Sequence, residues 1–173
     1  MQKIFFPLLL GASIAVYAMW TFDKPNQAAA AASLNLPKEN YPKDYFSPPV
    51  SGAIHATGTC GELRPNHFHA GLDIDGVVGN AVLAAADGYV ETIRVSATGY
   101  GNVLYVRHPN GYITLYGHLS RYADEIQKYV RQNQYDHERF EIELKPPEDM
   151  FKVKKGQQIA YLGNTGSSGG PHL

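Results

Sequence analysis

A succession of short strand-like runs, broken by turn residues over positions 81–117, constrains the fold of this chain more than any other feature. Residues 89–95 alternate apolar and polar side chains, the period of a strand with one buried face. Two further runs, 102–108 and 112–117, are joined by Pro-Asn-Gly at 109–111, and Asn-Gly is the strongest short hairpin signal. The sequence therefore predicts a mainly β domain built on an antiparallel β-sheet.

One segment, 121–134, has the pattern of a helix instead. Its apolar and aromatic side chains recur at helical spacing, at Tyr122, Ile126, Tyr129 and Val130. A short strand is predicted at 140–144 and a tight turn between two strands at 154–157. We expect 121–151 to be one short helical insertion, which either lies on the surface at low entropic cost or forms a wall of a binding groove.

The N-terminal part of the chain predicts export. Lys3 precedes an almost unbroken apolar run at 4–20, so residues 1–22 have the pattern of a signal peptide. An uncleaved membrane anchor is the alternative, because roughly 17 apolar residues can just span a bilayer. Residues 23–49 are rich in Ala, Pro, Lys and Asn and indicate a linker, or an extended arm lying on the domain. The domain itself is expected at 50–173, outside the cytoplasm.

Charge and cysteine content exclude several classes of protein. The chain carries 15 basic and 16 acidic residues, which gives no electrostatic reason to expect a nucleic-acid partner. Its one cysteine, Cys60, can form neither an internal disulfide nor a C-x-x-C zinc site. We expect Cys60 to be a partly buried packing residue. Nothing in the sequence indicates an oligomeric state.

The chemistry of the chain is suggested by its histidines. His69 and Asp73 are four residues apart, and an imidazole and a carboxylate are both good zinc ligands. Gly71 between them argues against a helix, so a strand followed by a turn would have to bring them together. An isolated pair of this kind is more often a surface histidine and a turn aspartate. His118 and His172, each taken alone, are more often structural than catalytic.

Order and flanking residues change that interpretation. The chain resembles the M23 family of zinc metallopeptidases, the lysostaphin-like or LytM-type enzymes. Their pattern is His-x-x-x-Asp, then a histidine that follows Tyr in a strand, then His-x-His. Here these correspond to His69 with Asp73, to His118 after Tyr116, and to His172. The resemblance covers 50–173, and several connecting segments also match, at 84–90, 99–102, 155–159 and 163–166.

The resemblance implies a specific site. His69 and Asp73 would be two of three zinc ligands, and the second histidine of His-x-His would be the third. His118 and His172 would be non-ligand histidines that orient the attacking water and shuttle its proton. The position of the third ligand directly follows Leu173. We therefore expect the domain to be incomplete at its C-terminus, and this chain to bind zinc poorly and have little activity.

The implied activity is hydrolysis of peptide bonds in peptidoglycan, in stem peptides or cross-bridges, within the periplasm or outside the cell. Asn66 or His67 is a candidate to support the zinc ligands, and His55, His108 and His137 are expected to be structural or exposed. One alternative is a non-catalytic LytM-type module that binds peptidoglycan or activates an amidase. Another is a lipoyl-type carrier domain, with Lys154 or Lys155 at a hairpin tip.

Overall fold

The computed structural model describes residues 43–65 and 67–173, which belong to one unit of the chain. The export segment expected at 1–22 and residues 23–42 of the expected linker lie outside this range. Among the residues described, no helix combines the length and the apolar character needed to cross a bilayer.

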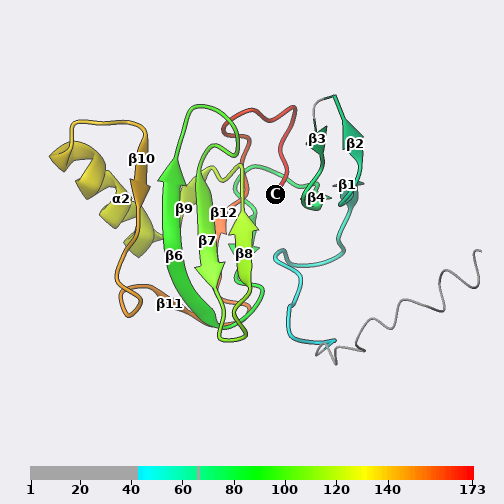
Figure 1. The fold of residues 1–173 in the computed structure, drawn as a ribbon, viewed down its shortest axis with the longest axis horizontal. Coiled ribbons are helices and arrows are strands. Elements are labelled where there is room, and N and C mark those ends of the chain that lie inside the picture. Colours follow the sequence, from blue (N-terminus) through cyan, green and yellow to red (C-terminus); the bar gives the residue numbers. More distant parts are fainter. Residues whose placement is uncertain (1–42, 66) are drawn as a thin grey trace, which may run out of the picture. The chain divides into compact units, whose positions relative to one another are not determined.

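The larger sheet of the described unit is antiparallel and has five strands (Figure 1). Its order is β10-β6-β7-β8, and β11 also pairs with β6. The hairpin predicted from Asn-Gly is confirmed, with Arg107 opposite Ile113 and Gly111 in the left-handed region at φ 85°. The five strands are β6 (Gly88–Val95), β7 (Val103–Arg107), β8 (Ile113–Tyr116), β10 (Ile142–Leu144) and β11 (Lys152–Val153).

Strand β6 departs from the strict alternation that its sequence predicts. Val90, Ile93 and Val95 are its buried residues, so the burial period is broken between the first two. The pairing of β6 with β7 shifts register between Val90 and Thr92. A bulge at this point adds one residue to β6 and returns the apolar side chains beyond it to the buried face.

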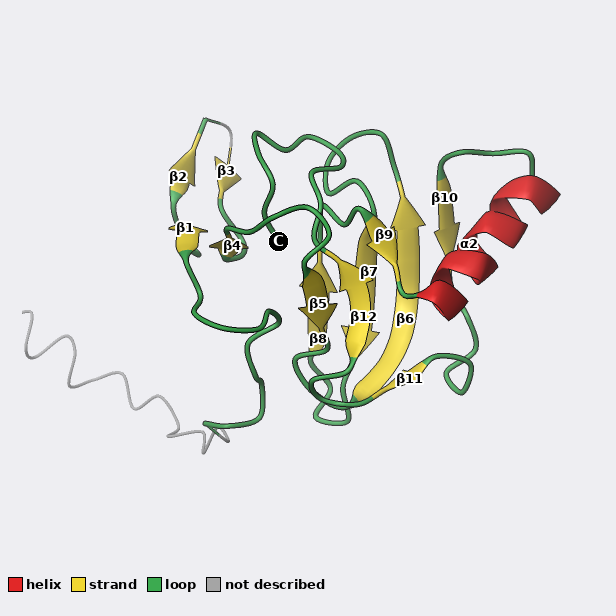
Figure 2. Cartoon of the chain, turned by 180° about the vertical axis from the view of Figure 1, so that it is seen from behind, coloured by secondary structure: helices red, strands yellow, loops and turns green. Residues whose placement is uncertain are grey.

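A second, three-stranded sheet lies against the first (Figure 2). Its order is β5 (Ala81–Leu83), β12 (Gln158–Tyr161) and β9 (Arg121–Tyr122). Apolar residues from both sheets and from the helix form one core. Its members include Val82, Val90, Ile93, Leu104, Val106, Tyr116, Leu119, Tyr122, Ile126, Val130, Ile159 and Leu162.

The predicted helix is present but begins later than its spacing suggested. Among the residues described, α2 (Asp124–Asp136) is the one helix, and Ile126 and Val130 on it are buried as expected. Tyr122 is not helical, because its backbone pairs with Ala160 in β12. Its side chain is buried, and its hydroxyl donates to the Arg94 carbonyl at 2.8 Å.

The turn at 154–157 connects the two sheets. Strand β11 before it pairs with β6, whereas β12 after it pairs with β5 and β9, so the turn is not the tip of a hairpin. Lys154 Nζ lies 3.0 Å from Asp87 Oδ2, and Lys155 Nζ donates to the carbonyls of Asp44 and Tyr45. Both ammonium groups are therefore paired with residues of the domain, and neither lysine stands at a hairpin tip, which argues against the carrier interpretation.

Residues 43–49, the described part of the expected arm, run beside β5. The Ser47 amide donates to the Ala85 carbonyl, and the Leu83 amide donates to the Pro49 carbonyl, both at 2.8 Å. Two short strand pairs complete the unit and carry the candidate site. They are β1 (Ala56–Gly58) with β4 (Asp73–Ile74), and β2 (Leu63–Arg64) with β3 (His67–Phe68).

Candidate metal centre

The β2–β3 hairpin positions His69. Leu63 lies opposite Phe68, and the backbones of Glu62 and His69 continue the pairing, with the His69 amide donating to the Glu62 carbonyl at 2.8 Å. Side chains alternate between the two faces of a paired strand. Glu62, Arg64 and His69 therefore share one face of the hairpin, while Leu63 and Phe68 share the other.

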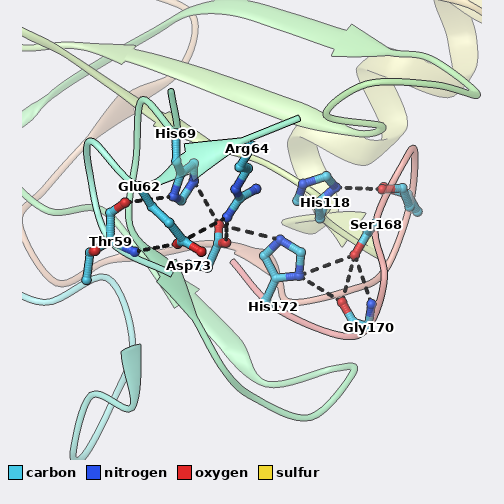
Figure 3. A network of polar contacts seen from close by, with 10 residues as sticks. Thr59, Glu62, Arg64, His69, Asp73, His118, Ser168, Gly170 and His172 are labelled. Carbon is cyan, nitrogen blue, oxygen red and sulfur yellow. Dashed lines mark hydrogen bonds and ion pairs between the residues drawn. The ribbon is translucent and has the colours of Figure 1, made fainter. Parts of the chain in front are cut away.

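The turn after β3 brings His69 and Asp73 into direct contact (Figure 3). Asp73 opens β4, and its Oδ1 lies 3.0 Å from His69 Nε2. Both side chains are largely covered, with 13% and 18% of their surfaces exposed. A strand followed by a turn thus brings residues i and i+4 together, as one face of a helix does in other metal sites.

His118 and His172 lie beside this pair. His172 Nε2 is 3.7 Å from Asp73 Oδ1, and the His118 and His172 rings are 4.5 Å apart between centroids. The backbone of His172 forms bridges with Asp75 and Gly163, which ties the last described segment to the residues after β4. The structure therefore groups all four residues singled out in the sequence at one place.

All three histidines share one orienting device. The Nδ1 atom of each lies against a backbone carbonyl: His69 against Thr59 at 3.1 Å, His118 against Thr165 at 2.8 Å, and His172 against Gly170 at 2.8 Å. Because a carbonyl can only accept, each neutral imidazole carries its hydrogen on Nδ1 and exposes a lone pair on Nε2. This arrangement is typical of metal-binding and proton-accepting histidines.

The contact between His69 and Asp73 calls for a cation. With its hydrogen on Nδ1, the neutral His69 ring presents an acceptor, Nε2, to another acceptor, Asp73 Oδ1, at 3.0 Å. Two acceptors at this distance repel each other unless a proton or a metal ion lies between them. The donor set, an imidazole nitrogen and a carboxylate oxygen, suits zinc.

The spacing of these donors also fits zinc. Two ligands bound at about 2.0–2.2 Å in a tetrahedral arrangement are roughly 3.3–3.6 Å apart. The Oδ1 atom of Asp73 lies 3.0 Å from His69 Nε2, a few tenths of an ångström closer than this separation, so a small movement of either side chain would admit the ion. Within residues 43–65 and 67–173, no group of three or more His, Cys, Asp or Glu side chains is arranged to hold a metal ion. The described residues thus supply a candidate ligand pair, His69 and Asp73, with the His172 imidazole beside it.

The backbone of His118 is unusual. Its φ is 56°, in the left-handed region that residues with a Cβ seldom occupy. The amide donates to the Tyr100 carbonyl at 2.8 Å, and Gly163 packs so closely beneath the His118 carbonyl that a Cβ there would overlap it. Strand β8 ends two residues earlier, at Tyr116, so His118 lies in a turn. The contacts of this turn with Tyr100 and Gly163 fix the direction of the imidazole ring.

Arg64 is the polar partner that sequence reasoning missed. Asn66 and His67 were the expected supports, but Asn66 lies outside the described residues and His67 is exposed. Instead Arg64 Nη2 forms an ion pair with Asp73 Oδ2. The sequence signal was weak, because Arg64 precedes Asp73 by nine residues and reaches it only if the intervening residues form a hairpin and a turn.

Comparison with known proteins decides the family. Residues 67–135 match the profile of Peptidase family M23. This chain belongs to that family. The M23 domain begins its match on β3 and includes three of the four grouped residues, His69, Asp73 and His118.

Relatives of the M23 domain include both hydrolases and activators. The chain is 32% identical over 157 residues to the peptidoglycan DD-endopeptidase ShyC of Vibrio cholerae, an alignment that covers 88% of this chain and 28% of ShyC. It is 35% identical over 98 residues to the murein hydrolase activator NlpD of Escherichia coli, covering 57% of this chain and 20% of NlpD. The alignments with the curated relatives span only about 18–28% of those proteins' lengths.

The fold agrees with the family. A crystal structure of a zinc-containing peptidase from Vibrio cholerae superposes with a TM-score of 0.55 at 28% identity, covering 75% of this chain and 35% of that one. The antiparallel β architecture expected of an M23 domain, with its helical insertion, is therefore confirmed.

The other histidines and Cys60 of the M23 domain lie outside this group. His108 is buried, with Nδ1 2.8 Å from the Asp87 carbonyl and Nε2 2.8 Å from Thr114 Oγ1. His55 and His137 are exposed. Cys60 is exposed as well, so the expectation of partial burial is wrong. It lies in the turn before β2.

Proposed function

We propose that this M23 domain is a zinc metalloendopeptidase domain that hydrolyses peptide bonds in peptidoglycan. The observation that carries the proposal is the contact of His69 Nε2 with Asp73 Oδ1 at 3.0 Å, with the opposite ring nitrogen held by the Thr59 carbonyl. Two acceptors aimed at each other form half of a cation site, and the nearby rings of His118 and His172 can accept protons.

The proposed roles follow from the atoms that are free. His69 Nε2 and Asp73 Oδ1 would hold zinc, whose chemistry in such a site is Lewis acidity toward a water molecule and a carbonyl oxygen. His118 and His172 have Nδ1 occupied by carbonyls, so Nε2 of each is the atom that can take a proton and return it to the leaving amine. Their rings, 4.5 Å apart, can serve the same substrate bond.

The strand register supports the position of a third ligand. Asp75 bridges His172, and Ile74 and Leu173 exchange two backbone hydrogen bonds of 3.0 and 2.9 Å. A residue added after Leu173 in this antiparallel ladder would stand opposite Asp73, with its side chain on the same face. We propose that a histidine at that position, as in the M23 pattern, completes the ligand set.

A zinc titration tests the proposal. Isothermal titration calorimetry would compare the full chain with a form extended by a histidine and a few further residues. We expect one tight zinc site in the extended form and weaker binding in the full chain. His69→Ala should remove the site, whereas His118→Ala should keep zinc but lose release of fragments from purified peptidoglycan, measured by mass spectrometry. A folded extended form that binds no zinc would end the peptidase proposal.

The second candidate is a non-catalytic module that activates a murein hydrolase. The observation in its favour is the 35% identity to NlpD, whose name describes an activator. This alternative predicts that the extended form releases no fragments by itself but increases fragment release by a peptidoglycan amidase added to the same assay. His118→Ala would leave that stimulation unchanged.

The proposed substrate sets the proposed location. Peptidoglycan lies outside the cytoplasmic membrane, and we propose that residues 1–22 direct export as a signal or an anchor. The partner would be a stem peptide or a cross-bridge of the wall. Fractionation of cells that produce the tagged full chain tests this, with recovery in the cytoplasm as the contradicting result.

A further inference from the structure

We infer that Arg64 is a positioning residue, which holds one carboxylate oxygen of Asp73 so that only the other faces the imidazoles. The inference rests on the zinc site proposed above and assigns a role to a residue outside the ligand set. Its starting point is that the two oxygens of Asp73 have different partners (Figure 3).

The division between the two oxygens is clear. Oδ1 faces both imidazoles, at 3.0 Å from His69 Nε2 and 3.7 Å from His172 Nε2. Oδ2 is paired with Arg64 Nη2. The guanidinium therefore contacts the carboxylate oxygen that does not face the imidazoles. A carboxylate held in this way can offer a metal ion one oxygen, which suits a four-coordinate zinc with an open position.

Arg64 is itself fixed by a ring of polar contacts. Its Nη2 lies 3.9 Å from Glu62 Oε2, and that same oxygen accepts the Thr59 amide at 3.3 Å. The Thr59 carbonyl in turn lies 3.1 Å from His69 Nδ1. The backbone of Thr59 thus contacts both sides of the network, with its amide bound to Glu62, the neighbour of Arg64, and its carbonyl bound to the His69 imidazole.

The backbone of β1 packs closely against this pair. Gly58 of β1 is buried and lies opposite Asp73 in the β1–β4 pairing. A Cβ built on Gly58 would overlap both the Asp73 carboxylate and the Arg64 guanidinium. A glycine at this position therefore lets the strand pack directly against the ion pair, which restricts rotation of the carboxylate.

Two effects of Arg64 on zinc oppose each other. Its positive charge repels a divalent cation, so Coulomb's law alone predicts tighter zinc binding when the charge is removed. Its hydrogen bond orients the ligand, and loss of such outer partners typically weakens metal affinity by about 10–100-fold. Since the guanidinium contacts the oxygen that does not face the imidazoles, we expect orientation to dominate. The sign of the change separates the two effects.

The experiment uses Arg64→Met, Arg64→Lys and a control, Arg131→Met. Arg131 is exposed on α2, at the opposite end of the described unit from β1–β4 (Figures 1 and 2). Zinc affinity is measured by competition with a chelator, in the full chain and in its histidine-extended form. Circular dichroism verifies that each variant is folded. The visible spectrum with Co²⁺ in place of zinc reports the coordination number.

We expect Arg64→Met to weaken zinc binding by about 10–100-fold, Arg64→Lys to weaken it less, and Arg131→Met to have no effect. With Oδ2 free, Asp73 can bind through both oxygens, so the Co²⁺ bands should lose intensity in Arg64→Met, as five-coordinate cobalt absorbs more weakly. Unchanged or tighter zinc binding in folded Arg64→Met, while the parent binds zinc, overturns this inference and leaves the proposed function intact. Failure of the parent to bind zinc in either form overturns both.

Discussion

The β-sheet core and the segment β1–β4, which carries the candidate ligands His69 and Asp73, are stabilised in different ways. Leu104 and Val106 of the central strand β7 are completely buried, whereas Leu63 and Phe68 of the β2–β3 hairpin are 76% and 69% exposed. The core therefore depends on apolar burial, and the segment β1–β4 depends on backbone pairing and on the polar ring around Asp73. The comparison teaches that metal affinity and global stability should respond to different substitutions.

The largest expected effect is a loss of zinc affinity, from a substitution in the segment β1–β4. Asp73→Asn keeps the shape of the side chain but removes the anionic ligand, so zinc binding by the histidine-extended form should fall below detection in calorimetry. The melting temperature should fall less than in the core variant below, because the amide oxygen of the new side chain can still accept a hydrogen bond from Arg64.

Asp124→Asn is the matched control for that experiment, since Asp124 pairs with Arg121 on the exposed surface and should leave zinc binding unchanged. Retained zinc binding in Asp73→Asn, or a collapse of its melting temperature, would remove the distinction between the two regions.

The second effect is on stability and comes from the core. Leu104→Ala deletes a completely buried side chain and should lower the free energy of unfolding by about 2–5 kcal/mol, measured by urea denaturation. Zinc affinity of the folded protein should stay the same. Leu115→Ala, at an exposed position on the neighbouring strand, is the control and should cost about 0.5 kcal/mol or less.

A smaller effect is expected from a buried hydroxyl. Tyr116 Oη accepts the Ala85 amide at 2.8 Å and the Thr114 hydroxyl at 2.9 Å, and burial raises the pKa of Tyr116 above its usual value. Tyr116→Phe leaves the buried Ala85 amide without its acceptor, which should cost about 1–3 kcal/mol in urea denaturation. Tyr105→Phe, on a partly exposed tyrosine of β7, should cost much less; equal losses would show that the hydroxyl contacts contribute nothing.

The smallest effect depends on pH. Hydrogen bonding from the Lys155 amide, and then from the Lys154 ammonium, lowers the pKa of Asp87. Because the folded pKa lies below the unfolded value of about 3.9, this carboxylate stabilises the fold above that pH and the contribution is lost as the pH falls through the lowered pKa. Between pH 7 and about pH 2, Asp87→Asn should therefore lose slightly less stability than the parent chain in urea titrations. Identical pH profiles would contradict this.

The sequence predicted those parts of the fold that depend on local interactions. The β7–β8 hairpin follows from Asn110-Gly111, whose turn chemistry acts within a few residues. Tyr122 was misassigned to the helix for the opposite reason. Its spacing from Ile126 is helical, but its backbone pairs with Ala160, far along the chain, and that partner cannot be identified from local spacing.

The same distinction applies to the candidate site. The pattern shared with the M23 family selected His69, Asp73, His118 and His172, which the structure groups together, while their individual roles stay predictions. Arg64 was not selected, because its contact with Asp73 requires both the β2–β3 register and the turn into β4. The carbonyl partners of the histidines were equally inaccessible to sequence reasoning, since any residue type can supply a backbone oxygen.

The positive φ of His118 has a consequence for protein engineering. A designer who transfers this constellation to another scaffold and copies only side-chain identities would place the histidine on regular backbone, with the ring aimed elsewhere. The transplant has to include the tight loop itself, with Gly163 beneath it and the Tyr100 carbonyl that receives its amide. The unit that has to be transferred is therefore the backbone conformation of the loop together with its imidazole.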